Sequence, residues 1–114
     1  MTGVRAVSWL WLAQRVSAAA LAFCVVVHLA TMIVAVRGGL TAAEILSRTR
    51  GSLAWAAFYG VFVLAAAIHA PIGLRTVVAE IRGGHDRAVD GIALVFGALI
   101  VVLGARAVAA VTGS

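Results

Sequence analysis

Three long apolar stretches constrain the fold of this chain more than any other feature of its sequence. They cover residues 16–36, 52–76 and 91–112, and an α-helix needs about 20 residues to cross the hydrocarbon core of a bilayer. Of the 114 residues, 64% are hydrophobic and 11% are charged, whereas a soluble domain carries about 25% charged residues. The sequence therefore predicts an all-α, integral membrane three-helix bundle, which forms a single membrane-embedded domain over residues 1–114, and excludes a soluble globular fold.

Short polar or amphipathic segments separate these stretches. Residues 7–12 contain two Trp side chains of the kind that favours the headgroup region, and we expect a short amphipathic segment there. Thr41 and Glu44 have the spacing of a capping box, which predicts a short surface helix in the first connection. Gly83 and Gly84 are expected to end the second long helix.

Two features within the apolar stretches concern helix packing. Pro71 interrupts the second stretch, removes one backbone donor and predicts a kink near His69. Ala93, Gly97 and Gly104 lie close to one stripe of the third helix. Small residues on one stripe allow a neighbouring helix to approach closely, so we interpret them as a packing surface.

The charged residues indicate anchoring at the membrane interface. The formal net charge is +5, and all the basic residues are Arg near predicted helix ends, so we do not expect nucleic-acid binding. The Arg residues divide almost evenly between the two membrane sides, and the positive-inside rule therefore does not decide the orientation. Phosphate-binding loops, paired Cys motifs and hydrolytic triads are missing from the sequence, so we predict no catalytic residues and no activity of the chain alone.

His69 stands out because it lies well inside the second apolar stretch. Ionisable groups at such depth cost about 2.5 to 3.5 kcal/mol on insertion scales, so a partner or a function is expected. A neutral imidazole there is suited to ligating haem iron or another metal. The alternative is a histidine that only forms a hydrogen bond to a neighbouring helix.

His28 is the second ionisable residue within a span, and it shares a helix face with Ser17 and Cys24. Because the first two long helices run antiparallel, we expect His28 and His69 to differ in depth by about 15 Å. One haem iron cannot then take both residues as axial ligands. His28 is therefore either a ligand of a separate centre, a structural residue or a quinone contact.

Arg15 lies at the mouth of the first span, on the same membrane side as Arg75, Glu80 and the approach to His69. We expect these residues to converge on one interfacial region. A fixed cation at that depth is suited to an anionic propionate or a quinone carbonyl. The alternative is an Arg that extends to the lipid headgroups.

Two short motifs resemble the cytochrome b membrane-anchor subunits of succinate dehydrogenase and fumarate reductase, in particular the three-span C-type anchor. The segment from Gln14 to Ala18 is similar to the family pattern of His or Gln, Arg, a hydrophobic residue, Ser and Gly at the start of the first helix. The segment from His69 to Arg75, followed by Glu80, is similar to the pattern His-x-x-x-Gly-x-Arg-x-x-x-x-Asp. The resemblance covers essentially the full chain.

This resemblance implies roles for individual residues. His69 would be an axial, metal-binding ligand of haem b, and Gly73 would make room for the porphyrin. Arg15 would lie near a haem propionate and a ubiquinone or menaquinone pocket, with Ser17 close by. Arg75 would be a further propionate partner. A second haem at His28, as in some anchors of this family, leaves the number of haems at one or two.

The resemblance also implies partners and a location. The chain would anchor a flavoprotein and an iron–sulfur subunit and pass electrons between the iron–sulfur subunit and the membrane quinone. The second axial ligand would come from a second membrane anchor or from another copy of the chain. The expected location is the bacterial inner (cytoplasmic) membrane, with a cytoplasmic N-terminus. Two other readings of the residues remain open: a cofactor-free structural or assembly subunit, and a small oligomeric transporter.

Overall fold

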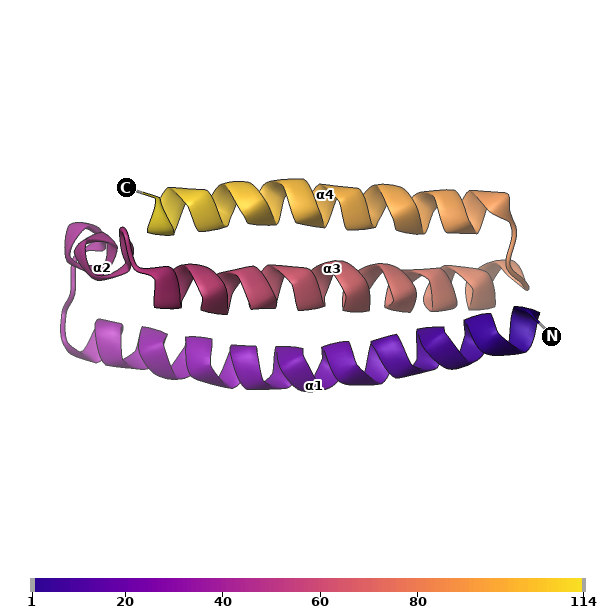
Figure 1. Ribbon diagram of the computed structural model, residues 1–114, viewed down its shortest axis with the longest axis horizontal. Helices are drawn as coiled ribbons and strands as arrows, with labels where there is room; N and C mark the ends of the chain where they lie inside the picture. Colours follow the sequence, from indigo (N-terminus) through magenta and orange to yellow (C-terminus); the bar gives the residue numbers. More distant parts are fainter. Residues whose placement is uncertain (1, 114) are drawn as a thin grey trace.

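The computed structural model describes residues 2–113, and these form four α-helices without a strand (Figure 1). The helices are α1 (Thr2–Arg37), α2 (Ala42–Thr49), α3 (Leu53–Arg82) and α4 (Arg87–Thr112). Three of them, α1, α3 and α4, are long and apolar enough to cross a membrane. The predicted all-α, three-span membrane fold is confirmed.

The central helix of the bundle is α3, which packs against α4 on one side and α1 on the other (Figure 1). Successive long helices are antiparallel, so the start of α1 and the α3–α4 connection lie together at one end, here called the N-terminal end. Helix α2 and the end of α4 lie together at the other end, here called the α2 end. The α2 end is held by two hydrogen bonds, from Thr49 Oγ1 to the Val111 carbonyl at 2.6 Å and from the Gly51 amide to the Thr112 carbonyl at 2.9 Å.

Local sequence signals account for most of the helix ends. The predicted capping box is present, because the Glu44 amide donates to Thr41 Oγ1 and the Thr41 amide donates to the Glu44 carboxylate. The predicted stop of α3 is also present, since Gly83 adopts the left-handed conformation with φ of 84° that favours glycine.

Two boundaries differ from the sequence prediction. Helix α1 begins at Thr2, so the amphipathic residues 7–12 continue into the first span rather than forming a separate segment. Helix α4 begins at Arg87 rather than after Asp90, because the Asp86 carboxylate accepts a hydrogen bond from the Val89 amide and caps the helix earlier.

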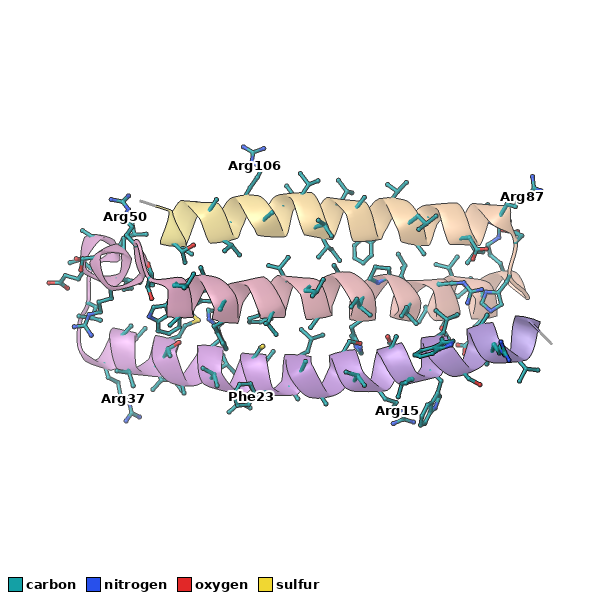
Figure 2. All side chains as sticks on the ribbon, viewed as in Figure 1. Arg15, Phe23, Arg37, Arg50, Arg87 and Arg106 are labelled. Atoms are coloured by element: carbon teal, nitrogen blue, oxygen red, sulfur yellow. The ribbon has the colours of Figure 1, made fainter. Side chains whose placement is uncertain are left out.

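Small residues fill the interior, and large apolar side chains cover the outside of the bundle. Buried positions include Ser17, Cys24 and Ala65. Outward-facing side chains include Phe23, which is 67% exposed (Figure 2). Leu94 is 74% exposed. Lipid tails solvate such side chains as well as a protein interior does, so close backbone approach, rather than burial of large residues, holds the helices together.

The stripe of small residues on α4 is a packing surface, as predicted. A Cβ atom at Gly97 would lie 3.0 Å from Pro71 Cγ, and one at Gly104 would overlap the Val63 side chain. Ala93 on the same stripe is buried. Helix α3 stays helical through Pro71, whose ring rests against the space that Gly97 leaves open.

Candidate functional site

The imidazole of His69 faces α1 at the level of Ser17. Ser17 Oγ lies 3.4 Å from His69 Nδ1 and donates a hydrogen bond to the Gln14 carbonyl at 3.1 Å. Ser17 is buried, with 4% of its surface exposed, and His69 is partly buried. Within residues 2–113 the structure gives the other ring nitrogen, Nε2, no hydrogen-bond partner. The structure therefore pairs His69 with Ser17 on the facing helix, a contact that the sequence had not predicted, and leaves one ring nitrogen without a partner.

One helical turn from His69, Gly73 faces Gln14 of α1. A Cβ atom at Gly73 would lie 3.4 Å from Gln14 Nε2, which is ordinary contact. Gln14 Oε1 is buried and is the single buried side-chain acceptor without a partner in the described part of the chain. A buried amide oxygen without a donor is costly, by about 1 to 3 kcal/mol.

Arg15 lies on the outer side of α1, away from α3 (Figure 2). Its guanidinium stacks over the Trp11 ring at 5.3 Å from the ring centre, a favourable cation–π geometry. The structure therefore does not bring Arg15 into contact with His69 in the isolated chain. Arg15 remains available to a ligand or subunit that approaches the outer face of α1.

Arg75 is engaged by α4. Its Nε lies 2.8 Å from the Asp90 carboxylate, and a second ion pair joins Arg82 to Asp86 at 2.9 Å. Glu80 is exposed at the same end of the bundle. The expected convergence is thus partial: Arg75 and Glu80 belong to the N-terminal end, but the nearest charged partner of Arg75 is Asp90.

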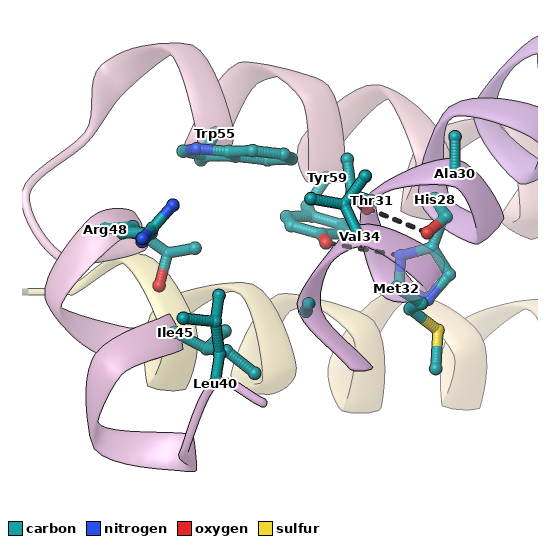
Figure 3. Close-up of a pocket in the computed structure, with 12 residues that line it drawn as sticks. His28, Ala30, Thr31, Met32, Val34, Leu40, Ile45, Arg48, Trp55 and Tyr59 are labelled. Atoms are coloured by element: carbon teal, nitrogen blue, oxygen red, sulfur yellow. Dashed lines mark hydrogen bonds between the residues drawn. The ribbon is translucent and has the colours of Figure 1, made fainter. Parts of the chain in front are cut away.

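His28 occupies a different environment at the α2 end of the bundle. Its Nδ1 lies 3.3 Å from the Tyr59 hydroxyl, and its ring makes edge contacts with Tyr59 and Phe62. Figure 3 shows this pair at the wall of a cavity of about 520 Å³, which Trp55 and Arg48 also line.

The two histidines belong to separate sites. His69 is level with Ser17, and His28 follows Ser17 by eleven residues on the same helix, which corresponds to about 16 Å along the axis. Because bonds from a metal ion such as zinc to a histidine nitrogen are about 2 Å long, one metal ion cannot bind both rings. The residue spacing had predicted this separation, and the contacts of the two rings agree with it.

Sequence reasoning missed two partners, Tyr59 of His28 and Asp90 of Arg75. Tyr59 is the single tyrosine of the chain, and once Ser17 is set opposite His69 the antiparallel register places Tyr59 opposite His28. To find this partner, one must know how far α1 is shifted along α3, and the side-chain periodicity of a single helix does not contain that information. Asp90 was missed because it was placed ahead of the third helix rather than within its first turn.

These features define a class: a multi-pass helical membrane protein with a partly buried histidine between its first two spanning helices. The family described as the succinate dehydrogenase/fumarate reductase transmembrane subunit matches residues 2–105. Since the match covers most of the sequence, the chain belongs to this family and is a membrane subunit of that type. No curated protein and no solved structure matches the chain.

Proposed function

We propose that the chain is a haem b- and quinone-binding membrane anchor of a succinate:quinone oxidoreductase, with His69 as an axial ligand. The observation that carries the proposal is the environment of His69: one ring nitrogen is occupied by Ser17 and the other has no protein partner. A histidine ligand commonly uses one ring nitrogen for the metal and the other for a hydrogen bond that fixes the ring.

The donor set favours iron in a porphyrin over a bare metal ion. No group of three or more His, Cys, Asp or Glu side chains within residues 2–113 is placed to hold a metal ion. A porphyrin supplies four nitrogen ligands itself, so a single protein histidine on one face is sufficient. When bound, haem b supplies one-electron redox chemistry.

The surroundings of His69 contribute in three ways. Ser17 holds the ring in orientation, and Gly73 keeps a side chain off the same face of α3 one turn away. The orphaned Oε1 of Gln14 is an acceptor for a protonated group of a bound cofactor or of a neighbouring subunit. The second axial ligand comes from a second anchor or another copy of this chain, because His28 is too distant.

The quinone part of the proposal rests on Arg15. Its guanidinium is exposed at the N-terminal end and is held in place by Trp11 rather than by an acidic side chain. An Arg in that position is suited to hydrogen-bond a quinone carbonyl and to stabilise the negative charge that develops on reduction. In this proposal the N-terminal end faces the cytoplasm of a bacterial cell and carries the iron–sulfur subunit and, through it, the flavoprotein subunit.

The proposal is tested by replacing His69. The complex purified through a tag on this chain is expected to show a reduced-minus-oxidised b-type spectrum, and His69→Ala is expected to abolish it while the chain still inserts in the membrane. His85→Ala, on the exposed α3–α4 connection, is the matched control and is expected to keep the spectrum. An unchanged spectrum in His69→Ala would remove the ligand assignment.

The second candidate is a cofactor-free structural or assembly subunit. It is favoured by the fact that both embedded histidines already have a hydroxyl neighbour within the chain. In that case the purified, folded complex lacks a b-type spectrum, and His69→Ala lowers stability without any spectral change.

A further inference from the structure

We propose that the hydroxyl partners of the two embedded histidines hold their rings in opposite tautomers. His69 then presents a bare Nε2 that is able to bind iron, whereas His28 presents an Nε2–H group that is not. For His69 the inference rests on the proposed function, and it adds Ser17 as a positioning residue. For His28 it argues against a second haem, because iron binding would require the ring proton to move to Nδ1 and the Tyr59 hydrogen bond to reverse.

Ser17 is an acceptor toward His69. The serine hydroxyl has one proton, and it donates this proton to the Gln14 carbonyl at 3.1 Å. Its contact with His69 Nδ1 at 3.4 Å is then favourable only if Nδ1 carries the ring proton. A neutral imidazole has one N–H, so Nε2 of His69 is left with a free lone pair.

Tyr59 is a donor toward His28. The Tyr59 hydroxyl has a single hydrogen-bonding neighbour among residues 2–113, which is His28 Nδ1 at 3.3 Å. Either tautomer of His28 leaves one donor without a partner among residues 2–113, the phenol proton in one case and the Nε2 proton in the other. The bond from the phenol to a bare Nδ1 is the stronger of the two, because a phenol is a more acidic donor than a neutral imidazole and an imidazole nitrogen is a better acceptor than a phenol oxygen. The favoured arrangement has the phenol donating to a bare Nδ1, so the ring proton of His28 lies on Nε2.

The consequence is a division of roles between two identical side chains. His69 offers a lone pair beside a buried serine, and His28 offers a hydrogen-bond donor at the wall of the cavity in Figure 3. The tautomers therefore favour haem binding by His69, toward the N-terminal end, over haem binding by His28 at the α2 end.

The tautomers are measured directly by nitrogen NMR on the full complex with ¹⁵N-labelled histidine and with any haem reduced to its diamagnetic ferrous form. A protonated ring nitrogen resonates well apart from a bare one. For His28 we expect a bare Nδ1 and a protonated Nε2, and in Tyr59→Phe we expect both signals to shift as the preference is lost. Variants of each histidine to Gln assign the signals. A protonated Nδ1 on His28 in the unmodified complex would overturn this half of the inference.

Ser17 is tested through the reduction potential of the haem. Ser17→Ala is nearly isosteric and removes the acceptor, so His69 becomes a weaker electron donor to iron and the potential is expected to rise while haem is retained. Ser17→Thr keeps a hydroxyl and is expected to restore the potential. Ser8→Ala, which removes an exposed hydroxyl bonded to the Val4 carbonyl on the same helix, is expected to change nothing.

The outcomes separate this inference from the proposed function. A potential in Ser17→Ala equal to that of the unmodified complex, with haem present, would refute the positioning role and leave the haem assignment standing. If the unmodified complex carries no haem, the proposed function fails, but the NMR signals of His69 still report its tautomer because they need no iron. A His69 ring protonated on Nε2 would then overturn the inference as well.

Discussion

The two ends of the α1–α3 contact place the same side chain in two different settings. At the N-terminal end, the small Ser17 faces His69 and Gln14 lies beside it with a buried, unpartnered oxygen. At the α2 end, the bulky Tyr59 faces His28 within a group of aromatic rings that includes Trp55 and Phe62. The comparison teaches that burial of a histidine in a membrane helix is not sufficient to identify a ligand. In our proposal, the hydroxyl opposite each ring decides which ring nitrogen carries the proton.

The largest difference between the ends is expected in haem content. His28→Ala is expected to leave the b-type absorbance of the purified complex unchanged, because we place the ring proton of His28 on Nε2, and His69→Ala is expected to abolish it. Pyridine haemochrome assays of the two variants, normalised to protein, provide the measurement. Loss of half the haem in His28→Ala would show that the two ends are alike.

The next difference concerns quinone reduction. Arg15→Leu is expected to lower the rate of quinone reduction about 10- to 100-fold, which corresponds to the loss of one charge-assisted hydrogen bond of about 1.5 to 3 kcal/mol. Succinate oxidation by a soluble dye should be unchanged. Arg106→Leu, an exposed arginine near the other end, is the matched control and should leave both rates intact. Equal losses in both assays for Arg15→Leu would argue against a quinone role at the N-terminal end.

A smaller effect separates two glycines of α4. Gly104→Ala places a methyl group into the Val63 side chain toward the α2 end, and we expect it to destabilise the bundle by about 1 to 3 kcal/mol through overpacking. Gly97→Ala should cost less, because its methyl group meets Pro71 Cγ at 3.0 Å and needs a shift of a few tenths of an ångström. Thermal unfolding of the purified protein followed by Trp fluorescence ranks the two variants, and a lower midpoint for Gly97→Ala would contradict the ranking.

The smallest difference concerns how each end is closed. Thr49→Val removes the buried hydrogen bond to the Val111 carbonyl and is expected to lower the free energy of unfolding by about 1 kcal/mol, independently of salt. Arg82→Gln removes an exposed ion pair with Asp86 and is expected to cost at most about 0.5 kcal/mol, less at high ionic strength. The free energy of unfolding of both variants, measured at low and high salt, tests this contrast. A salt-dependent loss of stability in Thr49→Val would contradict it.

The sequence predicted those parts of the molecule that depend on patterns along one helix. Apolar length gave the three spans, the Thr41 and Glu44 spacing gave the cap of α2, and the positions of Gly97 and Gly104 gave the packing face of α4. The contacts of His28 were not predicted, because its partner depends on the offset of α1 relative to α3 along the helix axes. That axial offset depends on packing along the whole α1–α3 contact, which no local pattern records.

The placement of Pro71 has a consequence for how the bundle meets lipid. A proline lacks an amide proton, so the Ala67 carbonyl, four residues earlier, loses its usual partner within α3. That oxygen lies 3.7 Å from where a Cβ of Gly97 would be. The Ala67 carbonyl group therefore points toward α4. The polar backbone that the proline frees is therefore directed toward a neighbouring helix rather than toward the acyl chains around the bundle.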